Sequence, residues 1–150
     1  MQLTIPPVVQ VAITAGAMWG VSKLAPSSIV YFRGQLAIAA LFILTGMSIA
    51  AIAIALFYKA KTTVDPTSPS KANTLVTTGL YSISRNPMYL AMALLLAGWA
   101  FYLGSLPNLL LLAAFIHAMT VLQIKPEETA LQEKFGDDYT DYCRRTRRWI

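Results

Sequence analysis

Two short polar segments, residues 79–89 and 125–128, flank a long apolar stretch and carry the side chains best suited to chemistry. The second segment supplies the adjacent carboxylates Glu127 and Glu128. If the apolar stretch folds as a hairpin, both segments lie at one membrane face, where a polar cofactor and an apolar substrate could meet. The pattern therefore indicates more than a membrane span, and favours an enzyme.

Each segment also has a purely structural interpretation. Asn86 is a favoured N-cap and Pro87 suits a first helical turn. Pro126 could begin another helix, whose first-turn acids would offset the helix dipole by roughly 0.3–1 kcal/mol each. That interpretation does not account for Arg85 and Tyr89, which place a cation and an aromatic hydroxyl at the same entrance. A functional site stays open as the alternative there.

The composition predicts a membrane protein. Hydrophobic residues make up 56% of the 150 residues, charged residues make up 13%, and the mean hydropathy is +0.55. A water-soluble domain of this size would have too little polar surface to cover its core. We therefore expect an all-α, polytopic membrane helical bundle that forms a single domain over residues 1–150.

The apolar runs predict about four transmembrane helices followed by a cytosolic helical segment. Residues 36–58 are nearly uncharged and long enough to cross roughly 30 Å of hydrocarbon. Residues 89–103 and 106–124 are so close in sequence that they predict an antiparallel hairpin. Residues 5–24 contain prolines and polar residues, so they predict either a tilted span or an interfacial helix. Gly16 and Gly20 within that run fit close helix packing, inside one chain or in a dimer.

The distribution of charge predicts the orientation. With four spans, Lys23 and Arg33 lie on one side of the membrane and ten basic residues lie on the other. The positive-inside rule then places both termini in the cytosol, in a cytoplasmic-type membrane. The single cysteine, Cys143, agrees with a reducing compartment. The ten basic residues are Lys59, Lys61, Lys71, Arg85, Lys125, Lys134, Arg144, Arg145, Arg147 and Arg148.

The net charge of +5 does not indicate nucleic acid as a partner, because the basic residues flank apolar spans. The cluster at residues 144–148 fits anionic lipid head groups, which attract each basic residue near the surface by about 1 kcal/mol. The alternative is that one of these arginines contacts a substrate carboxylate or phosphate. No metal site is expected, and we interpret His117 within a predicted span as a packing or helix-to-helix contact.

Residues 61–84 predict irregular backbone, in which residues 75–81 either dip into the membrane interface or form a surface loop. Beyond Pro126 we expect a helix with Glu128 pointing inward and Glu127 at the edge. If Gly136 does not break this helix, one face of it packs on the bundle. That face consists of Glu128, Leu131, Phe135, Tyr139 and Tyr142.

These segments resemble a known family. The run Gly79-Leu80-Tyr81…Ser84-Arg85-Asn86-Pro87-Met88-Tyr89-Leu90, followed by Pro126-Glu127-Glu128 and a Phe-Gly-x-x-Tyr-x-x-Tyr ending, is similar to integral-membrane methyltransferases related to isoprenylcysteine carboxyl methyltransferase. Phospholipid N-methyltransferases share a looser version of the two-part pattern. The resemblance covers roughly residues 60–150.

The resemblance implies an S-adenosylmethionine pocket on the cytosolic side, built from residues 75–150, roofed by the C-terminal segment and open laterally to lipid. The isoprenylcysteine enzymes usually have His at the position of Asn86, so this chain has no titrating imidazole there. No GxGxxG fingerprint occurs, so the usual dinucleotide-binding arrangement is not expected. The cofactor-binding residues that the resemblance implies are Val76, Gly79, Tyr81, Asn86, Pro87, Tyr89, Glu127 and Glu128.

Methyl transfer is an in-line displacement in which the enzyme mainly aligns the reactants and excludes water. We expect Arg85 and Glu128 to be catalytic. Arg85 could orient a carboxylate acceptor, whereas an amine acceptor would have to lose a proton, for which Glu127 or Glu128 is a candidate. The expected substrate is lipophilic, a lipid or a lipidated molecule with a carboxylate, amine or thiol. The alternative function is a non-catalytic small membrane protein that binds lipid or a protein partner.

Overall fold

The computed structural model describes residues 5–60 and 74–150. Within these ranges the regular elements are helical, as the composition predicts. A π-helical turn and two 3-10 turns, η1 and η3, lie among the longer helices. In order, the elements are α1 (Pro7–Leu24), η1 (Pro26–Ser28), α2 (Gln35–Lys59), η3 (Gly79–Ser82), α3 (Pro87–Leu103), α4 (Asn108–Met119), the π-helical turn (Thr120–Ile124), α5 (Lys125–Phe135) and α6 (Asp137–Arg145).

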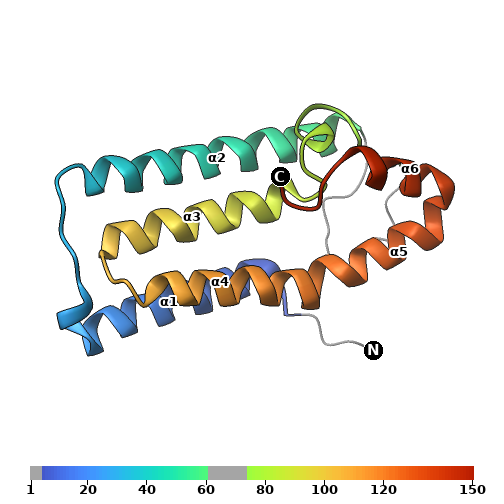
Figure 1. The fold of residues 1–150 in the computed structure, drawn as a ribbon. Helices are drawn as coiled ribbons and strands as arrows, with labels where there is room; N and C mark the ends of the chain where they lie inside the picture. The colour runs from blue at the N-terminus through green and yellow to red at the C-terminus, as the bar shows by residue number, and fades with distance from the viewer. Residues whose placement is uncertain (1–4, 61–73) are drawn as a thin grey trace.

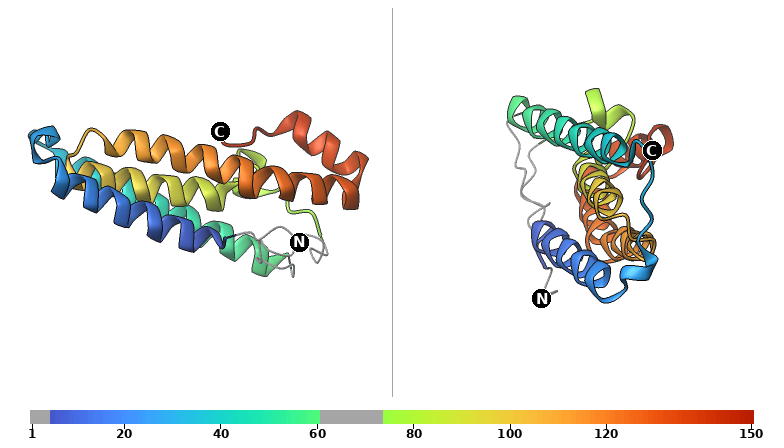
Figure 2. Two further views of the ribbon diagram at one scale, coloured as in Figure 1. Left: turned by 90° about the horizontal axis from the view of Figure 1, so that it is seen from below. Right: turned by 90° about the vertical axis from the view of Figure 1, so that its left-hand side faces the viewer.

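The helices α1 to α4 form a bundle in which the chain direction alternates from one helix to the next (Figure 1). The central helix is α3, which packs against α1, α2 and α4. The start of α1, the end of α2, the start of α3 and the whole of α5 and α6 lie at the same end of the bundle (Figures 1 and 2). We call this the site end. The loops around residues 25–34 and 104–107 form the opposite end.

Glycines allow α2 and α3 to pack closely. A Cβ atom added at Gly98 would lie 2.6 Å from Cγ1 of Ile43 and 2.9 Å from the carbonyl oxygen of Ala39. On α2, a Cβ at Gly46 would lie 3.0 Å from the carbonyl oxygen of Ala91. Small residues at such positions let helix backbones approach each other, which is how membrane helices maximise van der Waals contact. This pair of helices therefore forms a rigid support for the start of α3.

Two helical stretches of the described chain are long and apolar enough to cross a membrane, Gln35–Lys59 and Asn108–Phe135. Only 11% of the apolar window of the first stretch and 22% of that of the second is buried, which distinguishes them from the core helices of a soluble protein. This pattern is typical of helices that face lipid. Helix α3 is also apolar but shorter, at 17 residues. The uncharged part of the second stretch, residues 108–124, covers about 26 Å at 1.5 Å per residue, and the charged residues of this stretch begin at Lys125, the first residue of α5.

The predicted hairpin is confirmed. Helix α3 ends at Leu103, Gly104 adopts a φ of 68°, and α4 begins at Asn108. The predicted helix start at Pro126 is wrong. The chain stays helical from Asn108 through the π-helical turn into α5, so Pro126 lies inside a continuous helix and its neighbouring acids do not cap a helix N-terminus.

Candidate functional site

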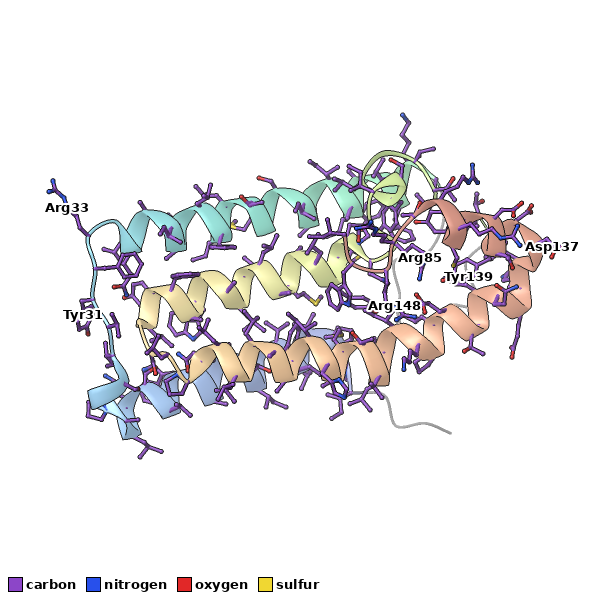
Figure 3. All side chains as sticks on the ribbon, in the orientation of Figure 1. Tyr31, Arg33, Arg85, Asp137, Tyr139 and Arg148 are labelled. Carbon is purple, nitrogen blue, oxygen red and sulfur yellow. The ribbon has the colours of Figure 1, made fainter. Side chains whose placement is uncertain are left out.

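The predicted segments meet at the site end, where the start of α3 faces α5 and α6 (Figure 3). The Arg85 side chain lies between them. Its Nη2 donates a hydrogen bond of 2.8 Å to Oε1 of Glu128, which forms an ion pair. Its Nη1 donates to the carbonyl oxygens of Thr146 at 2.7 Å and Cys143 at 3.2 Å. Arg85 therefore ties α3 to α5 and also holds the carbonyl groups at the end of α6.

Glu128 is paired with two arginines. Besides the contact with Arg85, its carboxylate accepts a bidentate pair of bonds from Arg148, from Nη2 to Oε2 at 2.7 Å and from Nε to Oε1 at 3.0 Å. Burial acts to raise the pKa of Glu128, but the hydrogen bonds and charges of Arg148 and Arg85 outweigh it and leave the pKa below its usual value. Glu128 is thus an ionised anchor at neutral pH.

Glu127 has a different environment. Its Oε1 accepts a short hydrogen bond from the Tyr89 hydroxyl and one of 2.9 Å from Nε2 of Gln123. No arginine or lysine of the described chain forms an ion pair with it. Burial raises the pKa of Glu127 to about 7, although both hydrogen bonds oppose the rise. The expectation that Glu127 lies at the edge is therefore wrong, since this carboxylate faces the bundle.

The two adjacent acids thus differ in the property that matters for proton transfer. Glu128 keeps its negative charge well below neutral pH, whereas Glu127 gains and loses a proton near neutrality. Pairs of carboxyl groups whose environments separate their pKa values are typical of acid–base sites. By this arrangement Glu127 can exchange a proton and Glu128 can hold a fixed charge.

Asn86 immediately precedes α3, as predicted, but its side chain does not cap the helix. Its Nδ2 instead donates to the carbonyl oxygen of Arg148 at 2.9 Å. Pro87 is the first residue of α3 and is buried. The capping interpretation is therefore right for Pro87 and wrong for the Asn86 amide, which is used in a tertiary contact.

The loop before α3 contributes backbone to the site. Gly79 begins η3 with a φ of 62°, and Tyr81, in the same turn, is buried with its ring edge-on to Phe57. The carbonyl oxygen of Tyr81 accepts a hydrogen bond of 2.6 Å from the Tyr142 hydroxyl. Val76 is half-buried just upstream. Much of the predicted irregular loop, residues 61–73, lies outside the described residues.

The predicted continuous face beyond Pro126 is interrupted. Gly136 has a φ of 53° and separates α5 from α6. Helix α6 folds back over the site end, which buries Tyr139 and Tyr142 by a route different from the expected one. The ring centroids of these two tyrosines lie 6.1 Å apart. His117 is also placed differently from the prediction, because its side chain is exposed on α4 instead of packed between helices.

Residues 146–150, which we call the strap, follow α6 and cross the site without helical structure. The backbone N–H of Arg85 donates to the carbonyl oxygen of Arg147 at 2.9 Å. The indole N–H of Trp149 donates to Oγ1 of Thr120 at 3.2 Å, and the Trp149 ring packs against the bundle core. A cavity of about 150 Å³ lies between η3, α6 and the start of the strap, lined by Thr77, Ser82, Tyr142, Arg145 and Thr146.

Sequence reasoning missed two residues of this site. Arg148 belongs to the basic cluster that we assigned to lipid head groups. The alternative interpretation, an arginine on a substrate carboxylate or phosphate, did not predict its ion pair with Glu128 either. Gln123 precedes Glu127 by four residues, which places both on one helix face, so this spacing could have identified it.

Comparisons with known proteins give the class. A family profile described as phospholipid methyltransferase matches residues 34–138, which include both predicted segments. The chain belongs to this family, and the resemblance inferred from the two segments is confirmed. The family indicates a membrane methyltransferase.

An uncharacterized protein of Haemophilus influenzae is 41% identical to this chain over 63 residues, which represent 42% of this chain and all of the relative. No solved structure matches. The strap lies beyond the residues that the family profile covers.

Proposed function

We propose that the chain is an integral-membrane, S-adenosylmethionine-dependent methyltransferase that moves a methyl group to a lipophilic acceptor at the cytosolic membrane face. One observation carries the proposal. Arg85, just before α3, and Tyr89, in its first turn, are hydrogen-bonded directly to Glu128 and Glu127 of α5, across an apolar hairpin. This arrangement concentrates cationic, acidic and hydroxyl groups at the end of a bundle whose remaining surface is largely apolar.

The proposed topology has four spans, α1 to α4, with the site end in the cytosol. Lys23 and Arg33 belong to the opposite end, where Figure 3 shows Arg33. The basic residues described at the site end are more numerous, and the positive-inside rule therefore favours a cytosolic site end with both termini. They are Lys59, Arg85, Lys125, Lys134, Arg144, Arg145, Arg147 and Arg148.

The residues present fit S-adenosylmethionine. Its ammonium group requires an acceptor, which Glu128 offers, and its carboxylate requires donors such as Arg85 or the Asn86 amide. Within the described ranges, the buried Nε of Arg85 has no hydrogen-bond partner, so it has a donor to spare. Tyr89 and the backbone around Val76, Gly79 and Tyr81 would border the group, as the resemblance implies. When bound, the cofactor supplies an electrophilic methyl group and leaves as a neutral thioether.

The acceptor that the geometry favours is an amine. An ammonium group has to lose a proton before its nitrogen lone pair can form the new N–C bond, while the C–S bond breaks and its electron pair stays on sulfur. Glu127 is suited to take that proton because its pKa lies near 7 and no cation of the described chain neutralises it. We assign to Glu128 and Arg85 the roles of binding and orientation, since each already carries a stable charge.

We expect the methyl acceptor to be a lipid and the protein surface around the site to contact membrane lipids. The exposed apolar side chains of α2 supply a lipid-facing wall, and the side chains of Arg144, Arg145 and Arg147 are exposed for contact with anionic head groups. Arg148 is excluded from that role because its side chain is paired with Glu128.

The test is equilibrium binding of S-adenosylmethionine to the purified chain in lipid nanodiscs. We expect saturable binding that falls at least about tenfold in Glu128→Gln, a loss of roughly 1.4 kcal/mol. The matched control is Glu133→Gln, because Glu133 lies exposed on the same helix, and it should bind as the wild type does. Radiolabelled methyl transfer to lipids with amine head groups then identifies the acceptor class. Absence of binding by a folded sample would instead support the non-catalytic protein that binds lipid or a protein partner.

A further inference from the structure

The strap occupies the polar groups to which the proposed function assigns cofactor binding. The carbonyl oxygen of Arg148 accepts a hydrogen bond from the Asn86 amide, and the guanidinium of Arg148 donates to both carboxylate oxygens of Glu128. The carbonyl oxygen of Arg147 accepts a hydrogen bond from the backbone N–H of Arg85, and the Trp149 indole N–H donates to Thr120 in the π-helical turn. These contacts come from three consecutive residues of one segment.

A ligand has to compete with the strap for these groups. Oε2 of Glu128 accepts from both Nη2 and Nε of Arg148, and Oε1 accepts from Arg85 and Arg148 together. One N–H of the Asn86 amide is directed at the strap backbone. Any ligand that binds Asn86 and Glu128 therefore has to displace the strap or share its contacts.

We propose that the strap is a gate over the cofactor site and that the Arg148–Glu128 ion pair is its latch. The proposal rests on the proposed function and adds a step to it, namely that the strap leaves Glu128 and Asn86 before the cofactor binds there. Arg148 is a positioning residue in this scheme, since it sets the fraction of molecules with an accessible site.

The latch is weak enough to open. The Arg148 side chain is 37% exposed, whereas Glu128 is 16% exposed, so water reaches one side of the pair. Half-exposed pairs contribute modestly, and a bidentate geometry places this one at the upper end of that range. When a binding-competent state is only partly populated, the apparent affinity of its ligand falls by that fraction. Weakening the latch should therefore tighten cofactor binding.

The test uses the full chain in lipid nanodiscs. The parent protein carries Cys143→Ser, which removes the native thiol, and Ile150→Cys, which introduces a thiol for a nitroxide label. Ile150 is exposed, so the label reports strap mobility without replacing a contact. The latch variant is Arg148→Gln. Its matched control is Arg147→Gln, which removes the same charge from the neighbouring exposed side chain and keeps the backbone carbonyl that Arg85 uses. Binding is measured with S-adenosylhomocysteine.

We expect the mobile fraction of the label to rise severalfold in Arg148→Gln without any ligand, and in the parent protein when S-adenosylhomocysteine is added. The association constant of Arg148→Gln should be about tenfold higher than that of the parent, as expected for loss of a contact of roughly 1.4 kcal/mol. Arg147→Gln should match the parent in both measurements.

Two results would overturn the gate alone. One is a label in Arg148→Gln that stays as immobile as in the parent, and the other is weaker binding by Arg148→Gln, which would make the strap a fixed roof. If the parent and Arg148→Gln both fail to bind S-adenosylhomocysteine, the proposed function itself is refuted and the gate with it. The label measurement without ligand distinguishes that failure from a failure of the latch.

Discussion

The buried Glu127 carboxylate makes the stability of the protein depend on pH in a defined direction. Burial raises the pKa of Glu127 from 4.5 to about 7. Between these two values the folded protein keeps a proton that the unfolded chain has lost, so the folded state binds more protons. Stability then falls as pH rises through this window. Glu127→Gln removes the titration while keeping the size and the hydrogen-bonding ability of the side chain.

The magnitude follows from the shift. One pKa unit corresponds to 1.36 kcal/mol, so a rise of about 2.5 units corresponds to about 3 kcal/mol. The free energy of unfolding of the wild type, relative to Glu127→Gln, should fall by this amount between about pH 4.5 and pH 8. Subtracting the variant cancels the other titrating groups, because both proteins share them.

The assay is reversible unfolding in mixed micelles, followed by far-ultraviolet circular dichroism at several pH values. If Glu127 also accepts the proton of an amine substrate, methyl transfer by the wild type should increase through pH 7, and Glu127→Gln should lose that increase. A difference in unfolding free energy between the two proteins that stays constant from pH 4.5 to pH 8 would refute the assignment of a raised pKa to Glu127.

Two further predictions concern packing. Gly98→Ala should destabilise the protein by about 1–3 kcal/mol, because the new Cβ would press on Ile43. Gly16→Ala is the control and should not destabilise it, since nothing lies within 4 Å of a Cβ there. Unfolding in mixed micelles compares the two variants, and equal stability would contradict the close α2–α3 contact. Tyr142→Phe should cost about 1–3 kcal/mol because it leaves the Tyr81 carbonyl without its donor; an unchanged unfolding free energy would show that water replaces that hydrogen bond.

The hairpin and the meeting of the two polar segments could be predicted because they depend on features that the sequence states directly. The connection between α3 and α4 is too short for anything except an antiparallel pair, which places Arg85 and Glu128 at one end. This topology alone is enough to predict which types of side chain meet at the site. What the topology leaves open is which residue pairs with which, since Arg85 had two acids within reach.

The ion pair of Arg148 with Glu128 could not be predicted from the sequence. A basic residue beside a membrane span is usually explained by lipid head groups, and nothing in its sequence position distinguishes Arg148 from Arg147. The distinction appears only when the strap crosses the site, with its backbone hydrogen-bonded to Arg85 and Asn86. Arg147 then faces outward, while Arg148 reaches Glu128.

The different roles of Glu127 and Glu128 depend on the π-helical turn. Pro126 has no N–H and its ring would crowd the carbonyl four residues earlier in a regular α-helix, so a helix that continues through it needs local widening. The turn at Thr120–Ile124 supplies this, since the N–H of Lys125 bonds to the carbonyl of Thr120, five residues earlier.

The extra residue of a π-helical turn rotates everything after it by about 100° relative to an uninterrupted α-helix. Without that rotation, the residues after Lys125 would present a different face to the start of α3. With it, Glu127 meets the Tyr89 hydroxyl while Glu128 meets Arg85. A proline that reads in the sequence as the start of a helix is therefore linked to the device that directs the two acids to separate partners.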